Sequence, residues 1–269
     1  MTKSKKFTPF QKGFIIFFVA LSIFTFLLPG ITHNSTWETV FGVVSIIGLI
    51  SAVSGVFNSI YIARADIYCY VFWIINTLTY AFVAYENKLY GQVIQNIIFI
   101  FPLEVIGFIA WTKNLNKKKA ENNGDQGIDV KKFGKKEWTF TIIGLIIFWI
   151  VYAIFLKYLP EILHGLFGIH VAPDSDLFFD SLTAILTIYA VWLTGARYIE
   201  QWTFWILSNG IGIVLFLIPL VGDIMNHTLN SSTLSGAVGW IQYGTSAVYG
   251  FVCWRALYKK EMAKKVALN

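Results

Sequence analysis

The sequence of 269 residues is poor in charge, since aspartate, glutamate, lysine and arginine make up only 13% of it. Soluble domains carry about 25% charged residues, so a soluble fold would leave most of its surface without charge. Hydrophobic residues account for 56% of the chain, and the mean hydropathy is +0.62. This composition argues against an ordinary soluble domain and predicts an all-α membrane protein.

The sequence lacks the residues that several kinds of chemistry require. Cys69 and Cys253 are not part of a CxxC motif, and all four histidines fall in predicted outer loops, so no redox pair or intramembrane metal site is predicted. The sequence has no GxxxxGK[ST] loop for a built-in ATPase. No lysine lies in the last apolar run to form a retinal Schiff base. We therefore expect no enzymatic activity, no catalytic residues, no cofactor and no metal.

Long apolar runs are plentiful. A membrane helix needs about 20 apolar residues, and we predict eight: 13–30, 38–60, 67–85, 89–111, 138–158, 177–195, 202–221 and 234–257. The first run is longer than a signal-peptide core and is not followed by a small-x-small cleavage motif. It is therefore predicted to be an extra N-terminal helix that is not removed.

Basic residues are distributed unevenly between the two sides that these spans define. With the N-terminus inside, 19 of the 21 lysines and arginines lie on the cytoplasmic side, leaving only Lys88 and Lys157 outside. This asymmetry predicts that both termini are cytoplasmic. It also assigns the net charge of +6 to loops beside lipid headgroups, so the lipid bilayer is a predicted partner and nucleic acid is not.

A lysine-rich stretch, 112–137, is predicted to be a flexible cytoplasmic linker. Without the extra helix, the spans form a 3+1+3 layout, which predicts two parallel three-helix repeats because an odd number of crossings separates them. The predicted units are the N-terminal tail and extra helix 1–36, the first repeat 37–111, the linker, connecting helix and outer loop 112–175, the second repeat 176–258, and the basic tail 259–269.

Weak internal similarity agrees with this layout. The middle helix of the first repeat opens with Tyr-Val-Phe-Trp at 70–73, and that of the second opens with Trp-Thr-Phe-Trp at 202–205. An amide follows each, Asn76 or Asn209, with a difference of one position relative to the tryptophans.

Carboxamide and aromatic side chains recur on the middle and last helices of both predicted repeats. Trp202, Trp205 and Asn209 project from one helix face, because three and then four residues separate them. Such amides can simply join neighbouring helices, and tryptophans can form interfacial belts. The alternative is a ligand site, since an amide in hydrocarbon is costly unless something satisfies it. The predicted substrate-binding set is Trp73, Asn76, Tyr80, Gln92, Asn96, Trp202, Trp205, Asn209, Trp240, Gln242 and Tyr243.

Glu104 is the acid that lies well inside a predicted span. An intramembrane carboxylate can serve as a proton relay or a counter-charge. The other interpretation, which we favour slightly from the sequence, is a position near the inner end of its helix. There it would reach headgroup water or pair with Arg64 or Arg197.

Two stretches resemble a known family. One runs from Trp73-Ile-Ile-Asn76 through Tyr-Glu-Asn-Lys-Leu-Tyr-Gly-Gln at 85–92 to Asn96, Phe101-Pro102 and Trp111; the other is Glu200-x-Trp202-x-x-Trp205-x-x-x-Asn209. Together they resemble the PnuC family of bacterial nicotinamide riboside transporters over roughly residues 38–257. The resemblance implies facilitated diffusion across the inner membrane through a 3+1+3 bundle related to the SWEET sugar carriers. It further implies trapping of the substrate by a cytoplasmic kinase, no ion coupling, and a homo-oligomer, in particular a trimer.

The predicted site is compatible with this substrate. Indoles can hold a cationic pyridinium ring at roughly 0.5–2 kcal/mol per contact, and the amides can bond a carboxamide and ribose. A phosphate would find no strong cationic partner, so we expect the mononucleotide to be excluded. A SWEET-like carrier of sugar or another small polar solute remains the alternative, and a membrane-embedded enzyme or assembly scaffold is a third possibility.

Overall fold

The computed structural model describes residues 6–120, 127–173, 176–226 and 231–268, and within them it has one isolated β-bridge and no β-strand. The helices in chain order are α1 (Pro9–Ile31), α2 (Trp37–Val40), α3 (Val43–Ala63), α4 (Cys69–Glu86), α5 (Tyr90–Ile94), the π-helix η1 (Gln95–Ile100), α6 (Phe101–Ala120), α7 (Lys135–Phe167), α8 (Leu177–Ala196), α9 (Gln201–Met225) and α10 (Ser231–Leu268). The prediction of an all-α protein is confirmed.

Long apolar helices dominate the structure. Within the described residues, six stretches are long and apolar enough to cross a bilayer: α1, α3, α5 to α6 taken as one helix, α7, α8 and α9. Their outward side chains are apolar too; Phe140 and Phe148 of α7 are 75% and 67% exposed. Such surfaces suit lipid rather than water, and the chain is a multi-pass membrane protein.

Seven of the eight predicted apolar runs lie within a long helix to within about two residues, whereas the run 38–60 is divided between the short α2 and α3 by a break at Phe41 and Gly42. Several helices also extend further than predicted. α6 continues to Ala120 instead of ending near residue 111, and α10 continues to Leu268 instead of 257. These extensions are rich in lysine. Hydropathy marks where a helix leaves hydrocarbon, whereas the backbone hydrogen bonds that define the helix continue into water.

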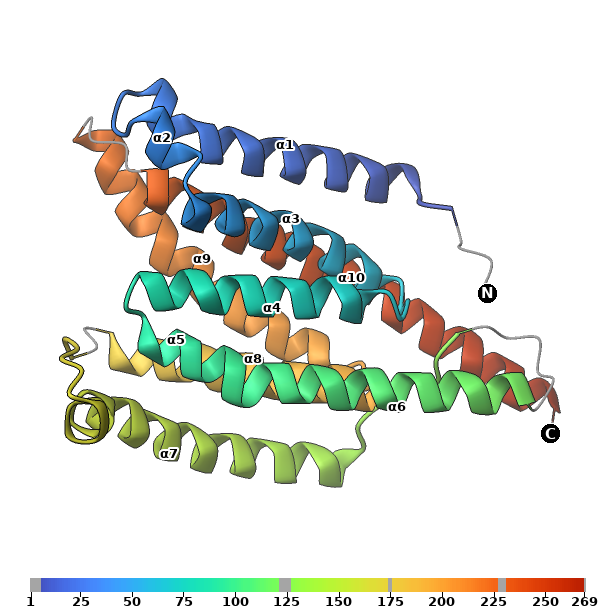
Figure 1. The fold of residues 1–269 in the computed structure, drawn as a ribbon. Helices are drawn as coiled ribbons and strands as arrows, with labels where there is room; N and C mark the ends of the chain where they lie inside the picture. The colour runs from blue at the N-terminus through green and yellow to red at the C-terminus, as the bar shows by residue number, and fades with distance from the viewer. Residues whose placement is uncertain (1–5, 121–126, 174–175, 227–230, 269) are drawn as a thin grey trace.

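The helices lie roughly side by side, with α1 along one edge of the bundle and α7 along the opposite edge (Figure 1). α1 packs on α3 and α10, while α7 packs on α8. The start of α1 and the ends of α6 and α10 lie at the same end of the bundle (Figure 1). We call it the basic end, because the last turn of α6 carries Lys117, Lys118 and Lys119 there.

Two parts of the chain, α3 to α6 and α8 to α10, are joined by matching hydrogen bonds. The indole N–H of Trp111 in α6 donates to the Thr194 carbonyl oxygen of α8 at 2.9 Å. The indole N–H of Trp254 in α10 donates to the Ile62 carbonyl oxygen of α3 at 2.8 Å. Both indoles are fully buried. The last helix of each part is therefore fixed to the first helix of the other.

The turn after α3 has the same geometry as the turn after α8. Ala65 and Arg197 both adopt positive φ, at 53° and 67°, and each N–H bonds to the carbonyl oxygen three residues earlier. The next residues, Asp66 and Tyr198, each donate to the carbonyl oxygen five residues earlier at 3.0 Å. These bonds are those of a Schellman cap. α4 and α9 can therefore be aligned residue by residue, counting from Ala65 and Arg197, and we call this alignment the common register.

The helix formed by α5, η1 and α6 contains a π-helical interruption. η1 covers Gln95–Ile100, and Pro102 lies in the first turn of α6. Proline lacks a backbone N–H, and its ring clashes with the carbonyl four residues earlier. Wider i→i+5 bonding just before the proline accommodates both effects. Gln95 and Asn96 are buried in this segment.

The predicted flexible linker is wrong for the part of it that the structure describes. Residues 127–134 form a segment, called the strap here, in which Ile128 and Val130 are 3% and 6% exposed. Alternation of these side chains with polar ones lets one face of the strap bury apolar surface. The linker was predicted from the high lysine content of residues 112–137, which does not reveal this alternation. Residues 121–126 of the predicted linker lie outside the described residues.

Backbone bonds and ion pairs hold the strap against the basic end. Its backbone exchanges two hydrogen bonds with residues 197–199, just after α8. The Lys118 ammonium of α6 lies 2.7 Å from the Asp129 carboxylate of the strap and 3.2 Å from the Glu261 carboxylate of α10. Glu261 also accepts the Val130 N–H at 2.9 Å. The strap thus joins the ends of α6, α8 and α10.

Candidate functional site

Two tryptophans meet between α4 and α9. Trp73 and Trp205 occupy corresponding positions, each eight residues after the positive-φ residue of its preceding turn. Their ring centroids are 6.1 Å apart and their planes are inclined by 52°. Trp73 is buried and Trp205 is half-buried. Such a pair offers π faces to a flat ring.

An amide and a phenol converge on α3 close to this pair. The Asn76 side-chain nitrogen, one turn after Trp73, donates to the Ser51 carbonyl oxygen at 2.8 Å. A Cβ atom on Gly55 would lie 3.2 Å from that nitrogen and 2.3 Å from the Tyr243 hydroxyl oxygen. Glycine at position 55 is therefore what lets Tyr243 of α10 approach Asn76 of α4.

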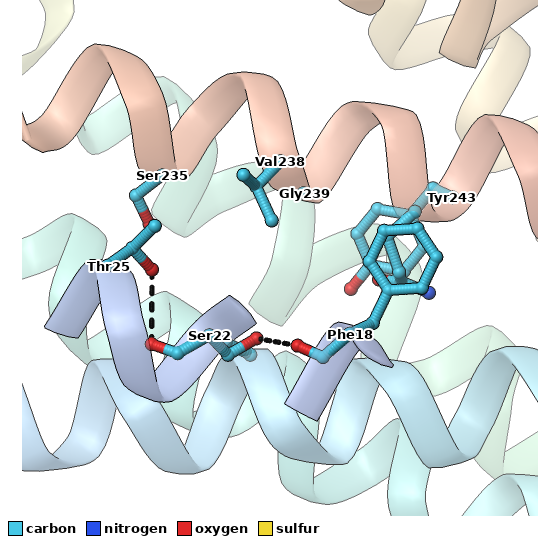
Figure 2. A pocket seen from close by; sticks show the side chains of 9 residues that line it. Phe18, Ser22, Thr25, Ser235, Val238, Gly239 and Tyr243 are labelled. Atoms are coloured by element: carbon cyan, nitrogen blue, oxygen red, sulfur yellow. Dashed lines mark hydrogen bonds between the residues drawn. The ribbon is translucent and has the colours of Figure 1, made fainter. Parts of the chain in front are cut away.

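A cavity of about 50 Å³, lined by both polar and apolar side chains, lies between α1, α3 and α10. Phe18, Ser22 and Thr25 of α1 line one side, and Ser235, Val238, Gly239 and Tyr243 of α10 line the other (Figure 2). The Ser22 and Thr25 hydroxyls donate to carbonyl oxygens of α1 at 2.8 and 3.1 Å, which leaves their lone pairs for the cavity. The volume suits water, but small-molecule sites typically measure about 300–1,000 Å³.

Gln242 also lines this cavity. It is 4% exposed, and its side-chain nitrogen donates to the Ser59 hydroxyl of α3 at 2.7 Å. α10 thus places two predicted site residues, Gln242 and Tyr243, against the same neighbouring helix. The cavity also brings α1 next to them, so the extra N-terminal helix borders the predicted site.

Asn209 of α9 is buried, with 4% of its surface exposed. In the common register it corresponds to Thr77, whereas Ser208 corresponds to Asn76, so the one-position offset between the two amides is confirmed. Ser208 makes the helix contact, because its hydroxyl donates to the Thr183 carbonyl oxygen of α8 at 3.3 Å. Asn209 has no hydrogen-bond partner among the described residues. Its amide is therefore available to a ligand.

Two predicted tryptophans lie in helix packing instead. Trp202 is 3% exposed, and its ring lies 6.0 Å from that of Trp254. A Cβ atom on Gly250 would come within 2.1 Å of the Trp202 ring. Trp240 likewise lies over Gly212 of α9, where a Cβ atom would approach to 2.2 Å. Both indoles fill space that a glycine leaves open between α9 and α10.

The remaining predicted residues are not brought to the Trp73–Trp205 pair by any described contact. Asn96 donates its side-chain N–H to the Gln92 carbonyl oxygen of its own helix at 2.8 Å. Gln92 is half-buried, and the Tyr80 side chain is 41% exposed.

Glu104 is fully buried, so the favoured expectation that it reaches headgroup water is wrong. Its Oε1 atom accepts the Thr77 hydroxyl at 2.5 Å, and its Oε2 atom has no hydrogen-bond partner among the described residues. Arg197, one expected partner, instead donates to the Ala110 carbonyl oxygen at 3.3 Å. The expectation failed because α6 continues to Ala120, well past the end of the apolar run.

Small residues on α3 were missed by reasoning from the sequence. Ser51, Gly55 and Ser59 recur at every fourth position and face Asn76, Tyr243 and Gln242 respectively. This small-xxx-small spacing is a known signal for close approach of membrane helices, and it could have identified them.

A larger cavity, of about 500 Å³, opens between α8 and α9. Its lining consists of glycine and hydrophobic residues: Phe179, Ile206, Leu207, Gly210, Ile211, Val214, Leu215 and Ile218. It offers no polar side chain to orient a ligand, so it suits hydrocarbon rather than a polar solute. The polar chemistry lies instead around Trp73, Trp205 and their amide neighbours.

The chemistry of this group is binding rather than bond rearrangement. Indoles, amides and a phenol can stack on a ring and exchange hydrogen bonds with it. None of the predicted binding residues is cationic. None pairs a nucleophile with a general base, as covalent catalysis requires. The group therefore suits a flat, polar, uncharged or cationic solute.

Known proteins are similar to this chain in sequence and in fold. A family model described as nicotinamide mononucleotide transporter matches residues 45–256. A nicotinamide riboside transporter PnuC of Neisseria mucosa is 25% identical over 78% of this chain and 72% of its own length. Another, from Haemophilus influenzae, is 22% identical over 95% of this chain and 96% of its own. The crystal structure of the vitamin B3 transporter PnuC superposes with a TM-score of 0.67 at 23% identity, over 95% of this chain and 94% of that one, which shows a shared fold.

Proposed function

The chain belongs to the family described as nicotinamide mononucleotide transporters, and from this premise we propose that it carries nicotinamide riboside across a membrane by facilitated diffusion. Its family is one of transporters rather than enzymes. Relatives that align with most of this chain are named nicotinamide riboside transporters.

The observation that carries the choice of substrate is the Trp73–Trp205 pair beside the Asn209 amide. Nicotinamide riboside contributes a cationic pyridinium ring, a carboxamide and ribose hydroxyls. A cation over an indole face gains roughly 0.5–2 kcal/mol. Asn209, which is buried without a partner among the described residues, can exchange hydrogen bonds with the carboxamide.

The riboside is a better match than the mononucleotide for which the family model is named. A phosphate taken out of water needs cationic partners or several strong donors. The basic side chain closest in sequence to Trp205 is Arg197, and it donates to the Ala110 and Asp129 carbonyl oxygens at the basic end. The predicted site therefore offers a phosphate no charge to replace its water.

The finer architecture is part of the proposal. We infer that α4 and α10 also cross the bilayer, which gives eight spans: α1, then a 3+1+3 core of two parallel repeats separated by α7. The matching bonds of Trp111 and Trp254 support two related repeats. The basic end faces the cytoplasm, because nearly all lysines and arginines belong to segments at that end. Both termini are then cytoplasmic, in the inner membrane of a bacterium.

Facilitated diffusion gives continued net uptake only if the substrate is converted to another compound inside the cell. Phosphorylation by a cytoplasmic nicotinamide riboside kinase would provide this conversion, and it would trap the substrate because the site disfavours the phosphorylated product. The protein is expected to form a homo-oligomer, a trimer in particular. Native mass spectrometry of the protein in detergent tests that expectation, and a monomer in mild detergent would contradict it.

Calorimetry on the detergent-purified protein tests the proposed substrate. We expect saturable binding of nicotinamide riboside, loss of that binding in Trp205→Ala, and no binding of nicotinamide mononucleotide. Binding of the mononucleotide as tight as that of the riboside would overturn the proposed exclusion of phosphate. A folded protein that binds neither compound would overturn the substrate itself.

A SWEET-like sugar carrier is the alternative that shares the predicted helix layout. Competition by glucose against the bound riboside distinguishes the two, since a sugar site has no need of a cationic ring. We expect no competition.

A further inference from the structure

Glu104 is a buried carboxylate with an unused oxygen atom. Its Oε1 atom accepts the Thr77 hydroxyl, and its Oε2 atom has no partner among the described residues. A buried polar group without a partner carries a free-energy cost that an incoming donor or cation can remove. Thr77 satisfies only one of the two oxygen atoms of Glu104. The helix packing described above therefore does not by itself account for a carboxylate at this position.

The position of Glu104 links it to the ring pair. Tyr70, Trp73 and Thr77 are spaced three and four residues apart, so they form one stripe along α4. The Tyr70 and Trp73 rings stack, with centroids 5.9 Å apart and planes inclined by 28°. The Tyr70 hydroxyl lies against Gly107 of α6, one turn after Glu104. The carboxylate therefore borders the same stripe that carries Trp73 to Trp205.

The second part of the chain has no such carboxylate. Glu104 lies seven residues before the buried Trp111, and the residue seven before the buried Trp254 is Ala247. Where α4 has Thr77 beside the carboxylate, α9 has Asn209. The two sides of the Trp73–Trp205 pair thus differ chemically, with an acid on one side and an amide on the other.

We propose that Glu104 is a specificity-determining residue that selects solutes carrying a delocalised positive charge on the α4–α6 side of the ring pair. This inference rests on the proposed function and names the feature of the solute that the site recognises, its positive charge. Coulombic attraction is strong where water is excluded, so a pyridinium ring compensates the carboxylate. Its carboxamide is then left to the Asn209 side. A neutral ring of similar shape would leave the Oε2 atom without a partner.

Two solutes of similar shape and different charge test this inference. Nicotinamide riboside is a cation, and its dihydro form is neutral. Binding of each to the purified full-length protein gives a ratio of dissociation constants, which we expect to favour the cation by about tenfold or more in the wild type. Glu104→Gln keeps the shape and an acceptor for Thr77. It should weaken binding of the cation by about 10- to 100-fold while the dihydro form stays within about threefold.

Glu200→Gln is the matched control. Glu200 is also a buried carboxylate with an unpartnered Oε2 atom, but it precedes α9 at the basic end, so its substitution should leave the ratio unchanged. A wild type that binds both forms equally overturns the inference without any variant. An unchanged ratio in Glu104→Gln overturns it as well, and both results leave riboside transport standing. A wild type that binds neither solute overturns the proposed function instead.

Discussion

In α3 to α6, the position one turn after the central tryptophan holds Thr77, and the third helix adds Glu104 beside it; in α8 to α10, the same positions hold Asn209 and Ala247. The contacts between the two parts nevertheless match, bond for bond, at Trp111 and Trp254. The indole bonds that join the two parts thus match, while the side chains next to the ring pair differ. An asymmetric ligand, with a charge at one place and an amide at another, needs such a difference.

The comparison also separates residues that hold helices from residues available for binding. Asn76 and Ser208 occupy corresponding positions, and each bonds a backbone carbonyl oxygen of the first helix in its own part. Asn209, one residue further along, makes no such bond among the described residues. The two carboxamides look alike in the sequence but therefore have different roles: Asn76 joins two helices, and the amide of Asn209 is available for binding.

The largest expected effect comes from filling a glycine contact that both parts share. Gly250→Ala would place a Cβ atom 2.1 Å from the Trp202 ring, which Trp254 confines on another side. Overpacking a close-fitting core costs about 1–3 kcal/mol, and we expect the upper end here. Gly107→Ala meets the Tyr70 hydroxyl at 2.5 Å, and this ring tip can shift more easily. Thermal unfolding in detergent should therefore show the larger loss for Gly250→Ala, and the reverse order would break the comparison of the two parts.

The matching indole bonds predict matching losses. Trp111→Phe and Trp254→Phe each remove the N–H donor and leave a buried carbonyl oxygen, of Thr194 or Ile62, with one acceptor site unused. Leaving a buried polar group unsatisfied costs about 1–3 kcal/mol. The two variants should lower the unfolding temperature by similar amounts. A loss confined to one of them would mean that the two parts are not held together equivalently.

Much of the fold could be predicted from the sequence, because it depends on apolar length and on tryptophan spacing. Every predicted apolar run corresponds to one long helix except 38–60, which is divided between α2 and α3. The offset between Asn76 and Asn209 is visible in the sequence itself. The burial of Glu104 was not predictable, because it depends on Thr77 from another helix and on the extension of α6 into water. The strap was missed for a related reason, since Ile128 and Val130 are buried in an apolar cluster that includes Trp254, a residue distant in sequence.

The residues of the predicted site could be only partly identified from the sequence, and this too has a physical reason. Helical spacing shows which residues share a face, but not which neighbour that face meets. Trp202 and Trp205 share a face of α9, yet one packs on Trp254 and the other meets Trp73. Glycines decide the difference, because Gly250 gives Trp202 room at the helix contact.

The two asparagines give a sharper test of binding against packing. Asn209→Ala should weaken riboside binding by about 3- to 10-fold, which corresponds to the loss of one net hydrogen bond, with little change in the unfolding temperature. Asn76→Ala should lower the unfolding temperature as well, because it removes the bond to Ser51. Calorimetry and thermal unfolding on the same preparations measure both quantities. Equal thermal losses in the two variants would assign Asn209 to packing.

The smallest expected effect concerns the strap, which reaches from α6 to α8 and α10. Burial acts to raise the pKa of Asp129, but hydrogen bonds from Lys118 and Asn114 outweigh it, so the pKa lies below its ordinary value. A carboxyl group with a lowered pKa in the folded state stabilises that state above its unfolded pKa of about 3.9, and this stabilisation is lost as pH falls through the folded value. Because Asp129 is 47% exposed, solvent screening limits the contribution to about 1 kcal/mol or less.

Hydrogen exchange of the strap, residues 127–134, measures this contribution directly. We expect amide protection in the strap and in its partner segment 197–199 to hold near neutral pH and to fall below about pH 4. Asp129→Asn should lower that protection already at neutral pH, where the wild type keeps it, because the ion pair with Lys118 is gone. Protection around Trp111 and Trp254 should stay constant, because their indole bonds go to Thr194 and Ile62 rather than to the strap. If those regions exchanged together with the strap, the two parts would be held by the strap rather than by the matching indole bonds.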